Sequence, residues 1–251
     1  MKRLTTQDLK KYLDKLYLYN NKVEFTYTDP VKFPRRYKSK RDKEISAFIS
    51  ATIAWGRRDM ILRSCEKIFM LMGNSPYSYI MEEKYKNLRK RPLGRSLHRT
   101  FFEEDLLYLC KGFNAYYSKN SSLETLFAST GDLWEGIGLF RDMMADANKS
   151  YSKHVANPAS SACKRLFLAL RWLVRREGPV DLGLWKGISP SSLYIPLDVH
   201  VGRVARQLGL LAVLPAANNK KAVIALTEKL RELCPEDPIK YDLALFGSSV
   251  S

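Results

Sequence analysis

Apolar residues recur along most of the chain at intervals of three and four positions, which is the spacing of one face of an α-helix. The pattern begins at residues 5–20, where Thr5 or Thr6 can cap a helix. Residues 42–56 are apolar almost throughout and predict a helix near the centre of the core, opened by Asp42. Further helices are predicted at residues 58–72, 103–117, 122–127, 132–147, 161–177, 199–210, 219–233 and 237–246. Strand-like alternation is rare, so the sequence predicts an all-α protein of about ten helices.

Proline, glycine and small polar residues interrupt these segments. Asn157-Pro158 breaks the chain before the helix at residues 161–177, for which Ser160 or Ser161 is the expected cap. Asp198 is the expected cap of the helix that follows. No internal repeat and no long linker is present, and a length of 251 residues suits one domain or two closely packed lobes.

The chain is strongly basic, with 42 Lys and Arg residues against 26 Asp and Glu residues and a formal net charge of +16. Such an excess indicates a polyanionic partner, most simply nucleic acid. Two runs concentrate the charge. Residues 31–43 hold seven basic residues and one acidic residue, and residues 84–99 hold seven basic residues and no acidic one. Clustered cations of this kind suit contacts with phosphate groups.

Other features of the sequence narrow the class of protein. The four cysteines lie far apart without a CxxC pair, and the three histidines lack the spacing of ligand pairs. We therefore expect reduced, buried thiols, no metal site and no cofactor. No apolar run approaches the ~20 residues of a membrane span. The segment MKRLTTQDLKKYLDKLY also lacks the apolar stretch of a signal peptide, so we expect a cytoplasmic protein without a membrane partner.

Two segments combine reactive side chains with helix starts. NPASSACKRLFLALRW places Lys164 near the start of an apolar helix, and YIPLDVHVGRVARQLGLL places Asp198 at the start of the next one. The second segment resembles the Val-Asp-x-His-Val-x-Arg signature of the helix-hairpin-helix (HhH-GPD) DNA glycosylase superfamily. The matching residues are Pro196, Asp198, His200, Val201 and Arg203. Bifunctional members carry a Lys at the second helix of the hairpin, and Lys164 occupies the corresponding place.

This resemblance differs in extent along the chain. The likeness to characterised glycosylases covers about residues 161–211 and the general order of helices. The chain is also similar, over most of its length, to an uncharacterised bacterial family of the superfamily. The segments that carry this similarity include DPVKFPRRY, DKEISAFISATIAWGRRD and DPIKYDLALFG. Asn157-Pro158-Ala159-Ser160-Ser161 stands where the usual Leu-Pro-Gly-Val-Gly hairpin would be, and the Lys-to-Asp separation is long. Both departures resemble the archaeal 8-oxoguanine glycosylase branch. The iron–sulfur loop of other members is missing.

The resemblance implies a two-lobed fold, with an atypical helix-hairpin-helix, within a single globular unit over residues 1–251. A helical barrel lobe at residues 44–178 would end in the Lys164 helix, and residues 1–43 with 179–251 would form the lobe that carries the Asp198 helix. The site would lie in the cleft between them. The implied activity is base-excision repair of double-stranded DNA by a nucleoid-associated monomer. The enzyme would remove a damaged base, an oxidised purine by preference, with strand cleavage through a Lys164 Schiff base.

The resemblance also implies roles for particular residues. Lys164 would attack the sugar, because burial and a helix N-terminus disfavour its ammonium form, and Asp198 would accept a proton and stabilise the cationic sugar. An aromatic wall for the flipped base would come from Trp55 and Trp172. DNA contacts are expected from Ser160, Ser161, Arg165, His200, Arg203, Arg35, Arg36, Arg57 and Arg58.

Each of these interpretations has a simpler alternative. Asp198 can be a helix cap alone or a cap and a catalyst at once, and Lys164 can be an exposed residue of a basic helix. Trp55 can be a buried residue in an ordinary turn. The whole protein can be a DNA- or RNA-binding module without chemistry, or a helical protein–protein scaffold. A pure binder has no reason to hold Lys164 close to Asp198, and a scaffold would bind DNA with a weak dependence on salt.

Overall fold

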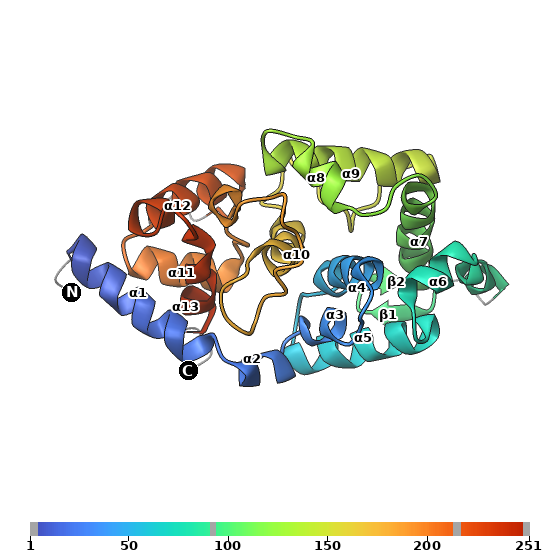
Figure 1. The fold of residues 1–251 in the computed structure, drawn as a ribbon, viewed down its shortest axis with the longest axis horizontal. Helices are drawn as coiled ribbons and strands as arrows, with labels where there is room; N and C mark the ends of the chain where they lie inside the picture. Colours follow the sequence, from blue (N-terminus) through green and yellow to red (C-terminus); the bar gives the residue numbers. More distant parts are fainter. Residues whose placement is uncertain (1–4, 91–93, 213–216, 248–251) are drawn as a thin grey trace. The chain divides into compact units, whose positions relative to one another are not determined.

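The computed structural model of the chain describes residues 5–90, 94–212 and 217–247. The prediction of an all-α protein is confirmed, because helices form almost all of the regular structure in these residues (Figure 1). The described strands, β1 (Ser96–His98) and β2 (Phe101–Phe102), form one short antiparallel pair.

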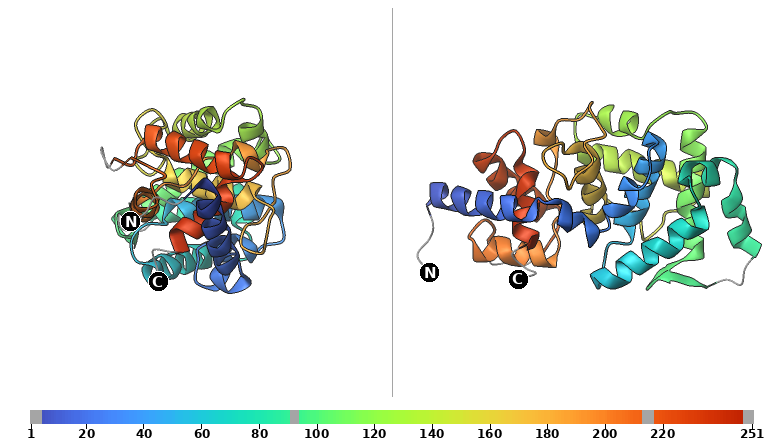
Figure 2. Two further views of the ribbon diagram at one scale, coloured as in Figure 1. Left: turned by 90° about the vertical axis from the view of Figure 1, so that its left-hand side faces the viewer. Right: turned by 60° about the horizontal axis from the view of Figure 1, so that its bottom comes forward.

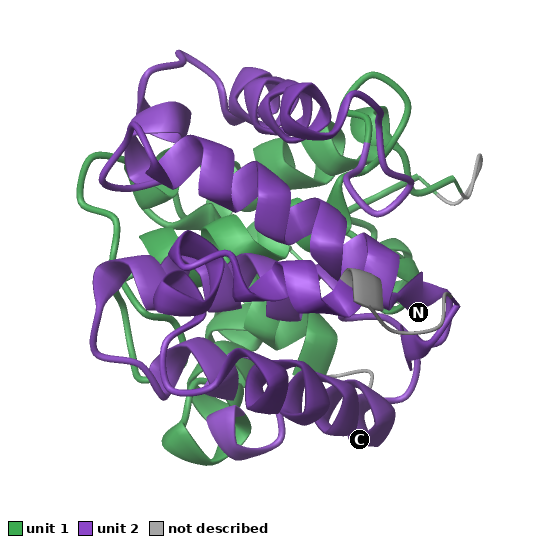
Figure 3. Ribbon diagram, turned by 90° about the vertical axis from the view of Figure 1, so that its right-hand side faces the viewer, with its two compact units in different colours: residues 1–25, 157–251 green, residues 26–156 purple. Residues whose placement is uncertain are grey.

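The chain folds into two compact units, which Figure 3 colours separately. The terminal unit combines residues 1–25 with residues 157–251, and the middle unit spans residues 26–156. These divisions differ from the expected lobe boundaries at residues 43 and 178. The helix that carries Lys164 therefore belongs to the same unit as the helix that carries Asp198. The physical reason is a set of ion pairs, described below, that ties the Lys164 helix to segments near the end of the chain.

The terminal unit contains both ends of the described chain. Its helices are α1 (Thr6–Asn20), α10 (Lys164–Val174), α11 (Val199–Gln207), α12 (Lys220–Leu233) and α13 (Tyr241–Gly247), with short 3-10 helices η2 (Pro190–Ser192) and η3 (Pro238–Lys240). The division between the two units, after residue 25, falls within the five-residue helix α2 (Val23–Tyr27).

Helix α1 packs along α13, as Figures 1 and 2 show. Leu13 is fully buried in this contact, and Asp14 accepts hydrogen bonds from Lys10 at 2.8 Å and from the Tyr241 hydroxyl at 3.0 Å. Lys240 Nζ lies 2.8 Å from the same carboxylate. Burial alone would raise the pKa of Asp14, but these donors outweigh it and hold the pKa at about 2. The first and last described helices are thus joined by both apolar and charged contacts.

The middle unit is organised around one buried helix. Its elements, besides β1 and β2, are α3 (Lys32–Arg35), α4 (Lys40–Thr52), α5 (Arg58–Met72), α6 (Pro76–Met81), the 3-10 helix η1 (Lys84–Lys90), α7 (Glu103–Tyr117), α8 (Glu124–Ala128) and α9 (Leu133–Asn148). Helix α4 is buried over most of its length, and the Phe48 ring stacks on Phe127 and Phe140. The prediction that this segment forms part of the core is confirmed.

The start of α4 differs from the prediction. The helix begins at Lys40 with Ser39 as its cap, so Asp42 does not open it. The Asp42 carboxylate instead accepts hydrogen bonds from the Ser75 hydroxyl and the Tyr77 backbone N–H, both at 2.8 Å. Two residues able to cap compete in this segment, and the tertiary contact with the start of α6 engages Asp42.

Candidate active site

Lys164 is the first residue of α10. The expected caps, Ser160 and Ser161, do not cap this helix, because the residue before Lys164 is Cys163 in the left-handed region, at φ 50°. Ser161 accepts a hydrogen bond from the Cys163 N–H at 3.1 Å, and Asn157 accepts one from Ala159. Side-chain hydrogen bonds therefore hold the turn at residues 157–163, just before Lys164. No residue from 149 to 163 is helical.

Asp198 is the N-cap of α11, as the sequence predicts. Its Oδ1 accepts a hydrogen bond from the Val201 N–H at 2.9 Å, which satisfies one of the free donors of the first helical turn. Its backbone carbonyl accepts a hydrogen bond from the Asn218 amide at 2.9 Å, and Asn218 in turn accepts one from Arg206. Hydrogen bonds to both its carboxylate and its backbone carbonyl thus hold Asp198 in place at the start of α11.

The fold brings the two predicted catalytic side chains together. Lys164 Nζ lies 3.7 Å from Asp198 Oδ2, the carboxylate oxygen that does not serve the cap. The Lys164 side chain is 25% exposed and the Asp198 side chain 21% exposed. Both groups are therefore held close together while solvent, and a ligand, can still reach them.

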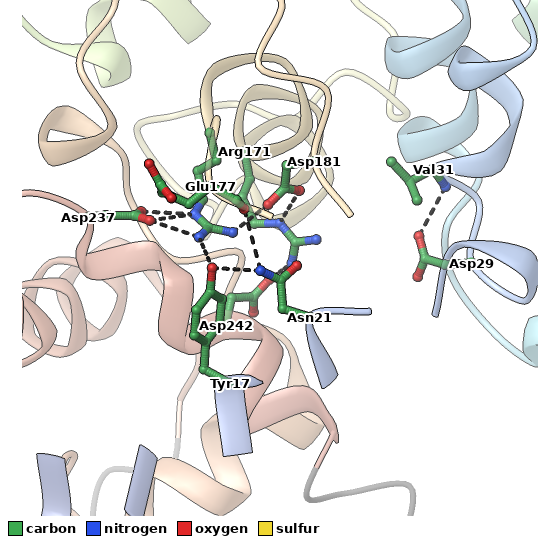
Figure 4. A network of polar contacts seen from close by, with 10 residues as sticks. Tyr17, Asn21, Asp29, Val31, Arg171, Glu177, Asp181, Asp237 and Asp242 are labelled. Carbon is green, nitrogen blue, oxygen red and sulfur yellow. Dashed lines mark hydrogen bonds and ion pairs between the residues drawn. The ribbon is translucent and has the colours of Figure 1, made fainter. Parts of the chain in front are cut away.

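Further along α10, Arg171 and Arg175 belong to a buried network of ion pairs (Figure 4). Arg171 and Arg175 recur at two- and three-turn spacing from Lys164, so the three cations share one helix face. Arg171 pairs with Asp181 at 3.1 Å and also with Asp242, and Arg175 pairs with Asp237 at 2.8 Å and also with Asp181.

The network and the candidate pair interact electrostatically. Burial raises the pKa of Asp242, and the Asp198 carboxylate adds to this effect, while Arg171 and Lys164 oppose it. Around Arg175, burial would lower the pKa of the guanidinium, but Asp181 and Asp237 raise it above its ordinary value. Removing one member of such buried pairs leaves an uncompensated charge and typically costs about 3–5 kcal/mol.

Several predicted DNA-contacting residues lie on the terminal unit. His200 and Arg203 are exposed on α11, one turn apart, beside an exposed Val199. Ser160 is exposed in the turn before α10, whereas Arg165 is partly buried, and burial lowers the pKa of its guanidinium. Two exposed side chains, His200 and Arg203, therefore lie on the helix that Asp198 caps.

The arginines predicted from the other basic segments belong to the middle unit. Arg35 is exposed, and Arg58 is half-buried. Arg36 donates two hydrogen bonds to Glu66, and Arg57 donates two to Asp59, so carboxylates on the same surface offset part of this charge.

The basic run at residues 84–99 is likewise partly compensated. Lys84 and Lys86 pair with the preceding Glu82 and Glu83, at 2.6 Å and 2.5 Å. Arg91 lies outside the described residues. The charge that the sequence concentrates in this run is therefore smaller on the folded surface.

The expected aromatic wall needs a correction. Trp172 is 0% exposed within α10 and offers no ring face to a base, because nearly every side of that helix is covered. Trp55 belongs to the middle unit and is half-buried, with its ring stacked on His154 and edge-on to His98. Trp55 therefore stays a prediction, and Trp172 is removed from the set.

Sequence reasoning missed Asn218, Arg171 and Asp242 as part of this site. Their partners are distant in sequence, and the sequence offers no motif that pairs them. In the part of the chain that the structure describes, no group of three or more His, Cys, Asp or Glu side chains is arranged to hold a metal ion. None of the described helices combines the length and the apolar character that a bilayer span requires.

Comparison with known proteins finds one family. A family model described as a protein of unknown function (DUF2400) matches residues 29–251. No curated protein and no solved structure matches the chain. The family match includes Lys164 and Asp198 and begins after α1.

Proposed function

We propose that this chain, which belongs to the DUF2400 family of proteins of unknown function, is a DNA glycosylase with associated lyase activity. Its substrate would be double-stranded DNA that carries a damaged base, an oxidised purine by preference. The protein would act as a nucleoid-associated cytoplasmic monomer without a cofactor. The observation that carries the proposal is the 3.7 Å approach of Lys164 Nζ to Asp198 Oδ2, within reach of solvent.

The two oxygens of Asp198 support a division of labour. Oδ1 is engaged by the Val201 N–H, which fixes the plane of the carboxylate, and Oδ2 faces the amine. A cap alone needs only the first contact. A basic helix alone would not need Lys164 beside a carboxylate at the start of another helix. The pair has the arrangement that a nucleophile and its proton acceptor require.

The proposed reaction uses both groups. Asp198 accepts a proton from the Lys164 ammonium, and the neutral amine attacks C1′ of the damaged nucleotide. The C1′–N bond to the base breaks, its electron pair leaves with the base, and the base takes up a proton from solvent. The nitrogen then loses a proton while the sugar ring oxygen gains one, and the ring opens to a Schiff base. Loss of a C2′ proton and departure of the 3′ phosphate cleave the strand.

Binding would place phosphate groups against the exposed side of the terminal unit. His200 and Arg203 project from the helix that Asp198 caps, and Ser160 lies exposed in the turn before Lys164. Contacts of this kind position the duplex without reading its sequence. Damaged bases are also easier to unstack, which favours their entry into a site.

The decisive experiment is borohydride trapping on duplexes that carry 8-oxoguanine, uracil or an abasic site. We expect base release from at least one lesion and a covalent protein–DNA adduct that Lys164→Ala abolishes. Lys221→Ala is the matched control, because Lys221 is an exposed residue in the first turn of another helix of the same unit. Its adduct yield should equal that of the wild type.

Three outcomes would contradict parts of the proposal. No base release and no adduct on any duplex would leave a nucleic-acid-binding protein without this chemistry. Base release without an adduct would assign a monofunctional reaction through Asp198. An adduct that persists in Lys164→Ala would remove Lys164 from the nucleophile role.

A further inference from the structure

The outward face of α1 carries large exposed side chains. Tyr12 is 42% exposed, Leu18 68% and Tyr19 71%, although all three belong to a helix whose opposite side is packed on α13. Lys11 and Lys15 are exposed on the same side, and Lys22 follows just after the helix ends. These residues recur at one- and two-turn spacing and therefore form a continuous row, here called the α1 row: Lys11, Tyr12, Lys15, Leu18, Tyr19 and Lys22.

The packing of α1 does not explain why the large side chains of the α1 row are exposed. The packing of α1 uses the other side of the helix, where Leu13 is buried and Asp14 meets α13. Exposed apolar side chains gathered in one place mark interaction sites more often than scattered ones do. The row can therefore be assigned to contact with something outside this chain.

The charge of the α1 row identifies the partner. Among the described residues, no carboxylate forms an ion pair with Lys11, Lys15 or Lys22, and Lys22 Nζ lies 5.1 Å over the Tyr19 ring. Asp8, near the start of the row, is engaged by the Thr5 hydroxyl. The row therefore presents positive charge and aromatic rings together, in a protein whose formal net charge is +16.

We propose that the α1 row binds single-stranded nucleic acid, with its lysines on phosphate groups and its tyrosines stacked on unpaired bases. Sequence-independent binding of single strands combines these two elements. Tyr12 and Tyr19 lie two helical turns apart, about 10 Å along the axis. That distance matches about three base steps of ~3.4 Å. A duplex would meet the lysines, but its stacked bases would leave the tyrosine rings without partners.

Other occupants fit the α1 row less well. An amphipathic helix that lies in a membrane surface buries a continuous apolar face, and the apolar face of α1 is already occupied by α13. A second copy of the chain would bring like charges together. The row also lies before residue 29, where the family match begins, so it is a feature of this chain in addition to the matched region.

The test uses the full chain and a fluorescein-labelled oligo(dT), with binding followed by anisotropy at several salt concentrations. Tyr12→Ala and Tyr19→Ala should each weaken binding about tenfold. The triple change Lys11→Gln, Lys15→Gln and Lys22→Gln should reduce the slope of log affinity against log salt by about 2, since each single-strand phosphate contact contributes about 0.7.

Matched controls separate the α1 row from general surface effects. Tyr27→Ala removes a tyrosine that is 63% exposed on α2, outside the row. A control with the same loss of charge replaces three exposed lysines elsewhere with Gln: Lys67, Lys119 and Lys186. Both controls should bind oligo(dT) within about twofold of the wild type, a change worth about 0.4 kcal/mol.

Circular dichroism and thermal melting confirm that each variant is folded. Unchanged affinity in the tyrosine variants would overturn the proposal, as would equal losses in the controls. Binding of anionic phospholipid vesicles that depends on the row, without binding of oligo(dT), would assign a membrane partner instead. The proposed base release uses Lys164 and Asp198, neither of which belongs to the row, so this test and the test of the proposed function can fail separately.

Discussion

Two substitutions of Asp198 can distinguish its role as a helix cap from its proposed role in catalysis. Asp198→Ala removes both the hydrogen bond to the Val201 N–H and the charge that faces Lys164. Asp198→Asn keeps an oxygen acceptor at the N-cap and removes only the charge. Asn is as effective as Asp at this position, whereas Ala provides no acceptor.

The structure sets the expected magnitudes. The cap contributes about 1 kcal/mol to the free energy of unfolding. The ion pair with Lys164 adds less, about 0.5 kcal/mol, because both side chains are partly exposed. Asp198→Ala should therefore lose about 1.5 kcal/mol, and Asp198→Asn about 0.5 kcal/mol. In a protein of this size these losses correspond to about 3–6 °C and about 1–2 °C in Tm.

Calorimetry and urea unfolding measure the stability of both variants, and base release from the lesion duplex measures chemistry. Asp198→Asn should lose base release by a factor of about 10² or more while it keeps almost all of its stability. Equal destabilisation by Ala and Asn would refute the capping argument. Normal base release by the Asn variant would reduce Asp198 to a cap.

Three further outcomes are expected. Glu44 is fully buried in α4 and accepts hydrogen bonds from the Tyr117 hydroxyl at 2.7 Å and the Leu123 N–H at 3.1 Å. Glu44→Ala should therefore lower the free energy of unfolding by about 3 kcal/mol in urea titrations, while Glu44→Gln should lose less. The depressed pKa of Asp14 contributes stability above its unfolded value of about 3.9, and this is lost as the pH falls through about 2. Asp14→Asn should flatten the stability profile between about pH 4 and pH 2, and an unchanged slope would contradict the assignment. A Cβ at Gly202 would lie 2.6 Å from Asn218 Oδ1, so Gly202→Ala should lower Tm although Ala favours helix, and a raised Tm would show that Asn218 moves aside freely.

Long helices with clear boundaries could be predicted from the sequence. The segments at residues 58–72 and 103–117 form helices with those limits, since several turns of apolar periodicity define each one. The short helices α2 and α3 were not predicted, because Pro30 and Pro34 interrupt this segment and suggest a loop instead. At the start of α4, packing decides which of two capping residues acts, and local sequence cannot show this.

The candidate site divides in the same way. The proximity of Lys164 and Asp198 was expected from the motif resemblance, and the cap at Asp198 was expected from its residue type. The orientation of Trp172 could not be predicted, because α10 is apolar on several sides and periodicity alone does not choose the buried one. The partners of Arg171 come from residues ten and seventy-one positions away, and only the tertiary fold brings them together.

The split composition of the terminal unit has a consequence for synthesis on the ribosome. Residues 26–156 emerge before α13 is made, so the middle unit can fold while α1 still lacks the helix that covers Leu13. The carboxylate that Arg171 requires, Asp242, also arrives only with α13. Until α13 is present, the face of α1 that carries Leu13 is therefore uncovered, and Arg171 lacks one of its two carboxylate partners. The terminal unit therefore completes its packing only after α13 has been synthesised, whereas the middle unit does not depend on that helix.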